Sequence, residues 1–488
     1  MSGAGRAAVL QGRTAITVHP AIGPTTTAAV LAAPAAIWLS TRQPLIALGL
    51  VLVGALAALV VAKPALAAYS LIVVTPLTAG IDRGSAIPLL RPNEALAAVV
   101  GGALATRALL GARAGRRPTL RLSQVEWGLL AMAVASSVLP LAWMAVRQRP
   151  IATDDLLYAL VLWKLGSVYL IVRASIRTVE EVRRCLYLSI GVAVLVGTIA
   201  IAQALDLLHV RALLAGYFLP NGNVGALANP RGGSTLALPA AVADLMICNL
   251  ALVVGLIARR ARHALVLTGA SLCMMMAAVS AGEFSSALGL VIAACLLAYV
   301  IRRPRLLLLA LPLVAVVAVV AWPVISTRLS GFQGTSGIPV SWVGRLRNLN
   351  SYFWPQLLDQ ANFLLGVRPS ARVVVSSQAT GYVWIESGYT WLLWGGGLPL
   401  LFAFGWFVQA SVRHSFLLAR WRPDAVGAAA LGFLVGIVVM AVLMLFDPHL
   451  TYRGSGDTLF ILAALARWPA GGPENAPDTM TTEGAVTA

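Results

Sequence analysis

The side chains best suited to chemistry gather in a polar stretch late in the chain, residues 326–383, and just after it. This stretch contains five arginines and one acid, Asp359, with tryptophans and tyrosines among them. The planar fork of a guanidinium group can bind two phosphate oxygens at once. The arginines are therefore candidates for a pyrophosphate clamp, and we assign this role to Arg328, Arg345 and Arg347. Ordinary solvated charges are the alternative.

Glu386 follows this stretch, within Trp-Ile-Glu-Ser-Gly-Tyr. Partial desolvation by neighbouring aromatic rings makes a carboxylate a stronger base, which suits the removal of a proton from a sugar hydroxyl. Glu386 is therefore the candidate catalytic residue, and a carboxylate that only stabilises a helix start is the alternative. Tyr389, Trp384 and Glu283 are candidates for binding the sugar. For the tryptophan, membership of an interfacial aromatic belt is the alternative.

Arg231 lies in a second turn-rich stretch, Asn-Pro-Arg-Gly-Gly-Ser-Thr, directly before an apolar segment that begins near Thr235. Backbone N–H groups at a helix start favour anions, and a nearby guanidinium group adds positive charge. Arg231 is therefore a further candidate for binding pyrophosphate. An ordinary connecting loop with one solvated arginine is the alternative.

Apolar segments occupy most of the remaining chain. Of its 488 residues, 59% are apolar and 11% are charged, whereas soluble domains contain about 25% charged residues. Apolar runs of about 17–25 residues recur, and this is the length of a helix that crosses a bilayer. We therefore predict an all-α, polytopic integral membrane protein with about 12–14 transmembrane helices. The candidate spans are residues 25–41, 44–62, 64–80, 93–111, 125–146, 155–173, 183–205, 235–258, 263–281, 284–301, 306–325, 384–412, 424–446 and 456–468.

Two charges lie deep within these spans, Lys164 and Asp244. A charge in the interior of a bilayer is costly unless it is paired or has a task. Counted from the span ends, the two residues lie at matching depths, so we expect them to form a structural ion pair. A proton relay is the alternative.

The arginines predict how the spans are oriented. Alternate short loops carry most of the basic residues, and such loops face the cytoplasm. Both termini are therefore predicted to be cytoplasmic, in a multi-pass protein of the cell (inner or plasma) membrane. Residues 326–383 are predicted to form one long, partly helical external loop. The other predicted regions are a cytoplasmic segment 1–24, a membrane domain 25–468 and a disordered cytoplasmic tail 469–488.

Charge and motif content exclude several classes of function. The net charge of +18 arises mainly from arginines in loops between spans, so membrane topology explains it and no nucleic-acid partner is predicted. The sequence contains no Walker loop and no His-Glu-x-x-His motif, and its five histidines are isolated from one another. We therefore predict a reaction without metal or cofactor. A cationic, aromatic loop at a membrane instead favours an anionic, sugar-bearing lipid as substrate.

Several short motifs occur in an order that resembles a known family. They are Leu89-Leu-Arg-Pro-Asn-Glu94, Arg231 before Gly-Gly-Ser-Thr, Leu364-Leu-Gly-Val-Arg-Pro369, and Glu386-Ser-Gly-Tyr389 followed by Leu392-Leu-Trp-Gly-Gly-Gly-Leu398. Together they resemble the O-antigen ligase and polymerase superfamily over residues 65–465. The chain departs from the ligases in having Glu386 where they have a histidine, which is closer to the polymerases. It also has Ala281-Gly-Glu-Phe-Ser-Ser in place of a Ser-Arg pair.

The resemblance implies a metal-independent membrane glycosyltransferase. Its substrate would be a lipid-linked oligosaccharide, whose polyprenyl-pyrophosphate-linked glycan units it polymerises or ligates on the outer face of the cell membrane, as in O-antigen or exopolysaccharide synthesis. Besides the bilayer, a flippase and a chain-length protein are the implied partners. One alternative is a transporter or flippase of lipid-linked sugars, which needs symmetric halves. Another is a non-catalytic envelope-assembly protein of the same fold.

Overall fold

The computed structural model describes residues 44–87, 90–115, 122–218, 231–259, 261, 263–303, 315–316, 319–320, 322–329, 332, 339–375 and 381–467. The predicted span 25–41, the segment 1–24 and the tail 469–488 lie outside the described residues, and so does most of the predicted span 306–325. From Ala57 onward, the described residues belong to one compact unit.

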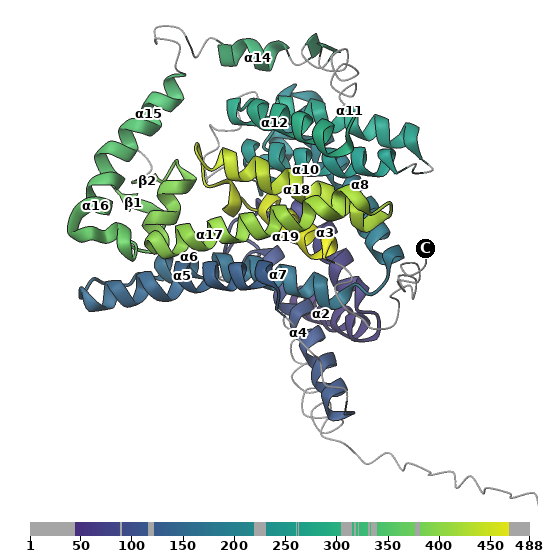
Figure 1. The fold of residues 1–488 in the computed structure, drawn as a ribbon, viewed down its shortest axis with the longest axis horizontal. Coiled ribbons are helices and arrows are strands. Elements are labelled where there is room, and N and C mark those ends of the chain that lie inside the picture. The colour runs from purple at the N-terminus through teal and green to yellow at the C-terminus, as the bar shows by residue number, and fades with distance from the viewer. Residues whose placement is uncertain are drawn as a thin grey trace, which may run out of the picture. The chain divides into compact units, whose positions relative to one another are not determined.

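Helices account for nearly all of the described structure (Figure 1). In a bilayer, backbone groups have no water to bind, so an apolar segment pairs them internally by forming a helix. The helices are α2 (Pro44–Ala62), α3 (Ala65–Thr78), α4 (Pro92–Arg113), α5 (Gln124–Val146), α6 (Thr153–Ala159), α7 (Val161–Ser175), α8 (Val179–Ala204), α9 (Val210–Ala215), α10 (Pro239–Ala258), α11 (Ala264–Ser280), α12 (Phe284–Ile301), α14 (Trp322–Leu329), α15 (Val340–Asn348), α16 (Trp354–Leu358), α17 (Gly388–Trp421), α18 (Ala425–Leu443) and α19 (Ser455–Ala466).

The prediction of an all-α membrane protein is confirmed in its main feature. Eight described helical stretches are long and apolar enough to cross a bilayer, and four shorter apolar helices accompany them. The predicted spans 44–62 and 284–301 coincide with α2 and α12. That the four shorter helices also cross, as a count of 12–14 requires, stays a prediction.

The centre of the bundle is formed by α10, α18 and α19, which lie side by side (Figure 1). Almost every side chain of α18 is buried, and a helix that is apolar on all faces must be surrounded by others. Glycines let α18 approach α10 closely. A Cβ atom added at Gly432 would lie 2.4 Å from Leu252 Cδ2, and one added at Gly436 would lie 2.8 Å from Cys248 Sγ. Small residues at such contacts are typical of helices packed within membranes.

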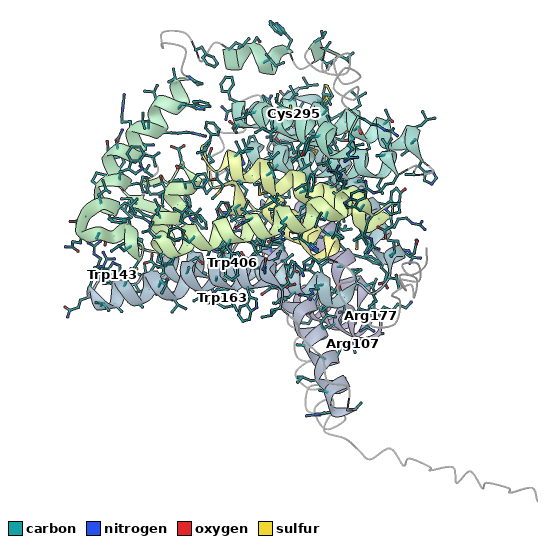
Figure 2. The ribbon with its side chains drawn as sticks, viewed as in Figure 1. Arg107, Trp143, Trp163, Arg177, Cys295 and Trp406 are labelled. Carbon is teal, nitrogen blue, oxygen red and sulfur yellow. The ribbon has the colours of Figure 1, made fainter. Side chains whose placement is uncertain are left out.

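Large apolar side chains remain exposed on the outer helices. Phe402 on α17 is 70% exposed, and Val138 on α5 is also exposed. Trp163 and Trp406 lie on the sides of α7 and α17 (Figure 2). Because soluble proteins rarely leave such extensive apolar surfaces in water, these faces support the placement of the protein in a membrane.

The ends of the described helices contact one another at two ends of the bundle. At one end, the Gly80 N–H group after α3 donates to Thr235 O before α10 (2.9 Å), and the Gly232 N–H group donates to Ser280 O of α11 (3.0 Å). We call residues 326–383 the long segment. Of its described residues, 339–375 lie at this end of the bundle through contacts described below, so we call this end the long-segment end. The other we call the opposite end.

At the opposite end, arginines bind the last carbonyl groups of neighbouring helices. Arg259 after α10 donates to Ala419 O (2.6 Å) and Arg422 O (3.0 Å) at the end of α17. Arg467 after α19 lies 3.5 Å from Glu126 at the start of α5. The structure thus separates two sets of loops, while the assignment of the long-segment end to the outside of the cell stays a prediction.

Two arginine–aspartate pairs hold the long segment against α6. Arg368 donates to both carboxylate oxygens of Asp155 (2.8 and 2.6 Å), and Arg372 donates to both oxygens of Asp154 (2.9 Å each). We call these pairs the α6 latch. Arg372 begins strand β1 (Arg372–Val374), which pairs antiparallel with β2 (Tyr382–Trp384). The described part of the long segment is therefore partly helical, as predicted, and also contains a small hairpin.

Candidate active site

One arginine contacts two carboxylates at the long-segment end. Arg345 Nη1 lies 2.6 Å from Asp447 Oδ2, and Arg345 Nε lies 3.7 Å from Glu386 Oε1. Asn348, one turn later on α15, donates to Glu386 Oε2 (3.3 Å). The structure thus brings together the predicted residues Arg345 and Glu386, and it adds Asp447, which the sequence analysis missed. We call these four residues the Arg345 cluster.

A glycine positions the two carboxylates by allowing the start of α17 to touch the end of α18. The Gly388 N–H group donates to Met444 O (2.7 Å), and a Cβ atom added at Gly388 would lie 2.5 Å from Met444 Sδ. Ser387 caps the helix, because its hydroxyl accepts from Thr390 N–H (3.3 Å). Glu386 therefore directly precedes a fixed helix start and faces the loop after α18.

The third element of the cluster is α15, which presents one face to the bundle. Trp342 packs against Phe446, with ring centroids 4.8 Å apart, and Arg345 and Asn348 follow at helical spacing on the same face. Arg347 lies roughly 200° around the helix axis from Arg345 and is exposed. The helical period thus directs the two arginines to different faces of α15, and the assignment of Arg347 to a phosphate stays a prediction.

Burial dominates the chemistry of Asp447. Its side chain lies in the loop after α18, outside the spanning segment, and only 9% of the residue is exposed. Burial raises the pKa of Asp447 to about 6, even though Arg345 and His449 favour the charged form, and the nearby Glu386 and Glu283 add to the increase. Asp447 is thus a carboxylate that gains or loses its proton close to neutral pH.

A buried histidine–aspartate pair lies beneath Asp447. His449 Nδ1 is 2.8 Å from Asp244 Oδ2 on α10, and neither residue is accessible to solvent. Burial lowers the pKa of His449, but the contact with Asp244 and the charges of Asp447 and Glu283 together outweigh this effect, so the net direction is upward. The ring of Tyr452 lies 4.8 Å from that of His449. In the described structure, His449 Nε2 and Asp244 Oδ1 have no hydrogen-bond partner.

The predicted ion pair between Lys164 and Asp244 is wrong. Lys164 Nζ lies 2.6 Å from Asp457 Oδ1, in the first turn of α19, and Asp244 binds His449 instead. Depth along a helix does not determine which neighbouring helix a side chain faces. Here α7 packs against α19, whereas α10 lies beside the loop that carries His449.

Arg231 and Glu283, two predicted site residues, bind each other. Arg231 Nη1 lies 3.0 Å from Glu283 Oε1, at the start of α12. The pair lies near the Arg345 cluster, since the charge of Glu283 acts on Arg345, Asp447 and His449. Arg231 is therefore close to the cluster, with a carboxylate as its present partner.

The other predicted site residues lie elsewhere or have structural contacts. Tyr389 donates its hydroxyl to Ala441 O (2.9 Å) and so joins α17 to α18. Trp384 packs in the hairpin against Tyr158, at 6.1 Å between ring centroids, and beneath the Arg372 guanidinium, at 5.8 Å. The side chain of Arg328 lies outside the described residues.

The loop Phe-Asp-Pro-His contains the signal that could have revealed Asp447 and His449, because it places two ionisable groups in one short connection between apolar segments.

Within the described ranges, no three carboxylate, histidine or cysteine side chains converge as metal ligands do. A metal-independent reaction stays a prediction.

Comparisons with known proteins yield no family: no family model, no curated protein and no solved structure matches this chain. Any chemical assignment therefore depends on the geometry of the Arg345 cluster. An arginine that contacts two carboxylates of unequal burial can exchange one of them for an anionic ligand and leave that carboxylate available as a base.

Proposed function

We propose that this protein is a membrane glycosyltransferase that joins glycan units carried on polyprenyl pyrophosphate, acting as a polymerase or ligase at the outer face of the cell membrane. The observation that carries the proposal is the contact of Arg345 with both Glu386 and Asp447 where the long segment meets the helix ends. The apolar outer faces of the helices support a substrate that is carried on a lipid.

The two carboxylates have different roles in this proposal. Asp447 is buried and binds Arg345 tightly, at 2.6 Å, so it orients the guanidinium group. Glu386 is more exposed and lies 3.7 Å from Arg345, so a substrate phosphate can replace it there. Glu386 is then available to the acceptor hydroxyl as a general base.

The reaction transfers a glycan from one lipid carrier to the sugar of another. The acceptor oxygen forms a bond to the anomeric carbon of the donor, and the bond from that carbon to the pyrophosphate oxygen breaks. Glu386 takes the proton of the acceptor hydroxyl, and polyprenyl pyrophosphate leaves with the bonding electrons. Arg345, with Arg231 nearby, stabilises the negative charge that develops on the leaving group.

The experiment uses purified protein with a polyprenyl-pyrophosphate oligosaccharide and measures the formation of longer lipid-linked chains. Replacement Glu386→Gln keeps the shape of the side chain but removes the base, so elongation should fall by roughly 10²- to 10⁴-fold. The control is Glu180→Gln, which neutralises a surface carboxylate at the start of α8 and should elongate like the wild type. Undiminished elongation by Glu386→Gln would remove Glu386 from the mechanism.

A further inference from the structure

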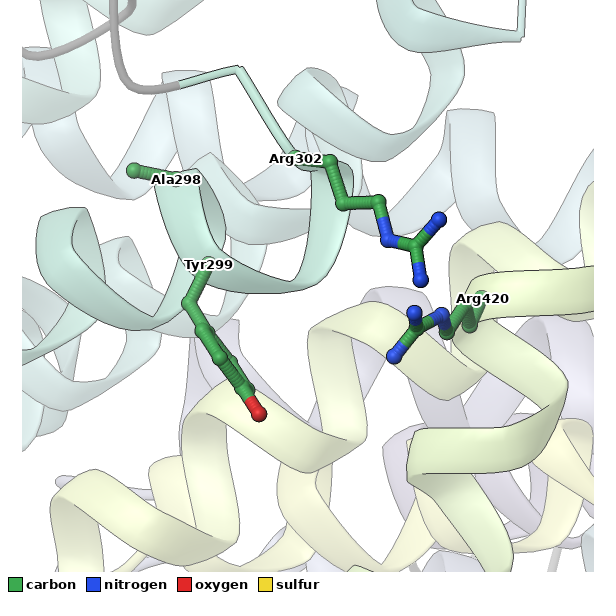
Figure 3. A pocket seen from close by; sticks show the side chains of 4 residues that line it. All are labelled: Ala298, Tyr299, Arg302 and Arg420. Carbon is green, nitrogen blue, oxygen red and sulfur yellow. The ribbon is translucent and has the colours of Figure 1, made fainter.

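A pocket opens at the opposite end of the bundle, far along the helices from the Arg345 cluster. It has a volume of about 530 Å³ and lies between the last turns of α12 and α17, lined by Ala298, Tyr299, Arg302 and Arg420. Figure 3 shows the side chains of Arg302 and Arg420 extending from these two helix ends toward each other. Two positive charges therefore face one cavity.

These two arginines have no carboxylate partner in the described part of the chain. Arg420 Nε is buried and has no hydrogen-bond acceptor there, which costs free energy until a ligand provides one. The C-terminal end of a helix favours each arginine separately, whereas two guanidinium groups that extend toward each other repel.

Arg259, at the same end, shows how a structural arginine is satisfied in this fold. Its guanidinium donates to Gly255 O (2.9 Å), Ala419 O (2.6 Å) and Arg422 O (3.0 Å). Backbone carbonyl groups at the ends of α10 and α17 thus accept hydrogen bonds from the N–H groups of Arg259. Arg420 Nε lacks such an acceptor in the described part of the chain, so a ligand could supply one.

Aromatic rings lie beside Arg420, and Tyr299 also lines the pocket. Tyr299 stacks on Phe416, with centroids 6.1 Å apart, and the Arg420 guanidinium lies 5.7 Å from the Phe416 centroid and 5.6 Å from that of Trp421. Tyr299 is 68% and Trp421 71% exposed. Arginines beside exposed aromatic rings at the ends of membrane helices are typical of the zone where lipid headgroups lie.

We propose that this pocket binds the phosphate of an anionic phospholipid, which Arg302 and Arg420 hold between them. The phosphate supplies acceptors for the two guanidinium groups, Arg420 Nε included, and cancels their repulsion. The exposed rings of Tyr299 and Trp421 favour a lipid over free phosphate, because they provide an apolar surface for the acyl chains. The site is independent of the glycosyl transfer proposed above.

The test measures lipid binding to the purified protein by native mass spectrometry. Phosphatidylglycerol is titrated against the wild type and the double variant Arg302→Gln/Arg420→Gln, with phosphatidylcholine and inorganic phosphate as parallel ligands. We expect the double variant to bind phosphatidylglycerol at least roughly tenfold more weakly than the wild type. Arg177→Gln is the matched control, because Arg177 is exposed at the same end, after α7, and does not line the pocket (Figure 2).

Three results would overturn the proposal. They are equal binding of phosphatidylglycerol by the double variant, an equal loss in Arg177→Gln, and competition by inorganic phosphate at the same concentration, which would make the ligand a free anion. The single variant Arg302→Glu covers the case in which the double variant fails to fold. Arg302 is exposed after the last residue of α12, and reversal of its charge should by itself weaken the binding of phosphatidylglycerol.

Discussion

Arg345 contacts two carboxylates that differ in distance and burial. Asp447 lies 2.6 Å away and is buried, whereas Glu386 lies 3.7 Å away with a side chain that is 32% exposed. An incoming phosphate can displace the weaker contact at a lower cost than the stronger one. Asp447 thus keeps the guanidinium group of Arg345 in place, whereas a substrate phosphate can displace Glu386 from it.

Asp447 predicts how activity depends on pH. Its pKa of about 6 means that the carboxyl is charged at pH 7 and becomes neutral as the pH falls through 6. The neutral form binds Arg345 more weakly, so the rate of elongation should fall on the acid side of pH 6. The measurement is the initial rate of chain elongation from about pH 5 to pH 8, a range that brackets this pKa.

The variant Asp447→Asn separates this effect from the titration of other groups. The pKa of Asp447 also depends on the charges of Arg345, His449, Glu386 and Glu283. The variant removes only the ionisable group of Asp447 and leaves these four residues in place. Its remaining activity should be low and free of the decline below pH 6. A decline of the same shape in the variant would assign the effect to another group.

At the residue scale, the sequence analysis selected two of the four members of the Arg345 cluster. The residue types and positions of Arg345 and Glu386 were sufficient to select them as candidates, because a charged loop beside a membrane span contains only a few ionisable side chains. Asp447 and the pair His449–Asp244 were missed, since their roles depend on contacts between remote segments. No spacing in the sequence encodes those contacts.

At the scale of elements, the position of Arg345 depends on how the long segment is fixed. The α6 latch holds one side of the long segment. On another side, the kink of α17 at Gly397 leaves room for the turn Asp359–Leu364. Gly397 has φ +65°, and a Cβ atom there would lie 2.4 Å from Leu364 O. Only glycine fits both the conformation and the space.

The latch predicts unequal effects for two adjacent aspartates. Asp155 is fully buried and accepts two hydrogen bonds from Arg368. Asp155→Asn leaves that arginine without its charged partner, and we expect the docked segment to lose about 2 kcal/mol of stability. Limited proteolysis within residues 339–375 should accelerate accordingly.

Asp154→Asn is the matched comparison, because Asp154 binds Arg372 in the same way but its side chain is 24% exposed. Its effect on proteolysis should be smaller, since solvent screens the pair. Equal rates of cleavage in the two variants would show that burial of the latch does not control docking of the segment.

Most apolar helices were predictable to within a few residues, as α2 and α12 show, because the thickness of the bilayer sets the length of a span. The exception among the described apolar helices is α17, which ends at Trp421 and not near residue 412. The hairpin and the latch were not predictable. Short strands such as β1 have no distinct period in the sequence, and Asp154 and Asp155 lie more than two hundred residues from their partners.

At the scale of the whole molecule, the helices separate two sets of loops that differ in chemistry. The long-segment end contains carboxylates around Arg345, and the opposite end contains the facing pair Arg302 and Arg420. This distribution fits an enzyme that acts at one membrane face and contacts anionic lipid at the other. If the orientation predicted from the arginines holds, the proposed reaction takes place at the outer face.

The most direct test of the proposed transfer is elongation in proteoliposomes, with lipid-linked glycan available at the outer face. Arg345→Lys keeps the charge but loses the planar fork, and the account predicts that elongation falls by roughly 100-fold. Arg211→Lys, at a partly exposed pair with Asp206 after α8, should retain the wild-type rate. Equal elongation by Arg345→Lys and the wild type, or transport of the lipid-linked glycan without elongation, would contradict the proposed function.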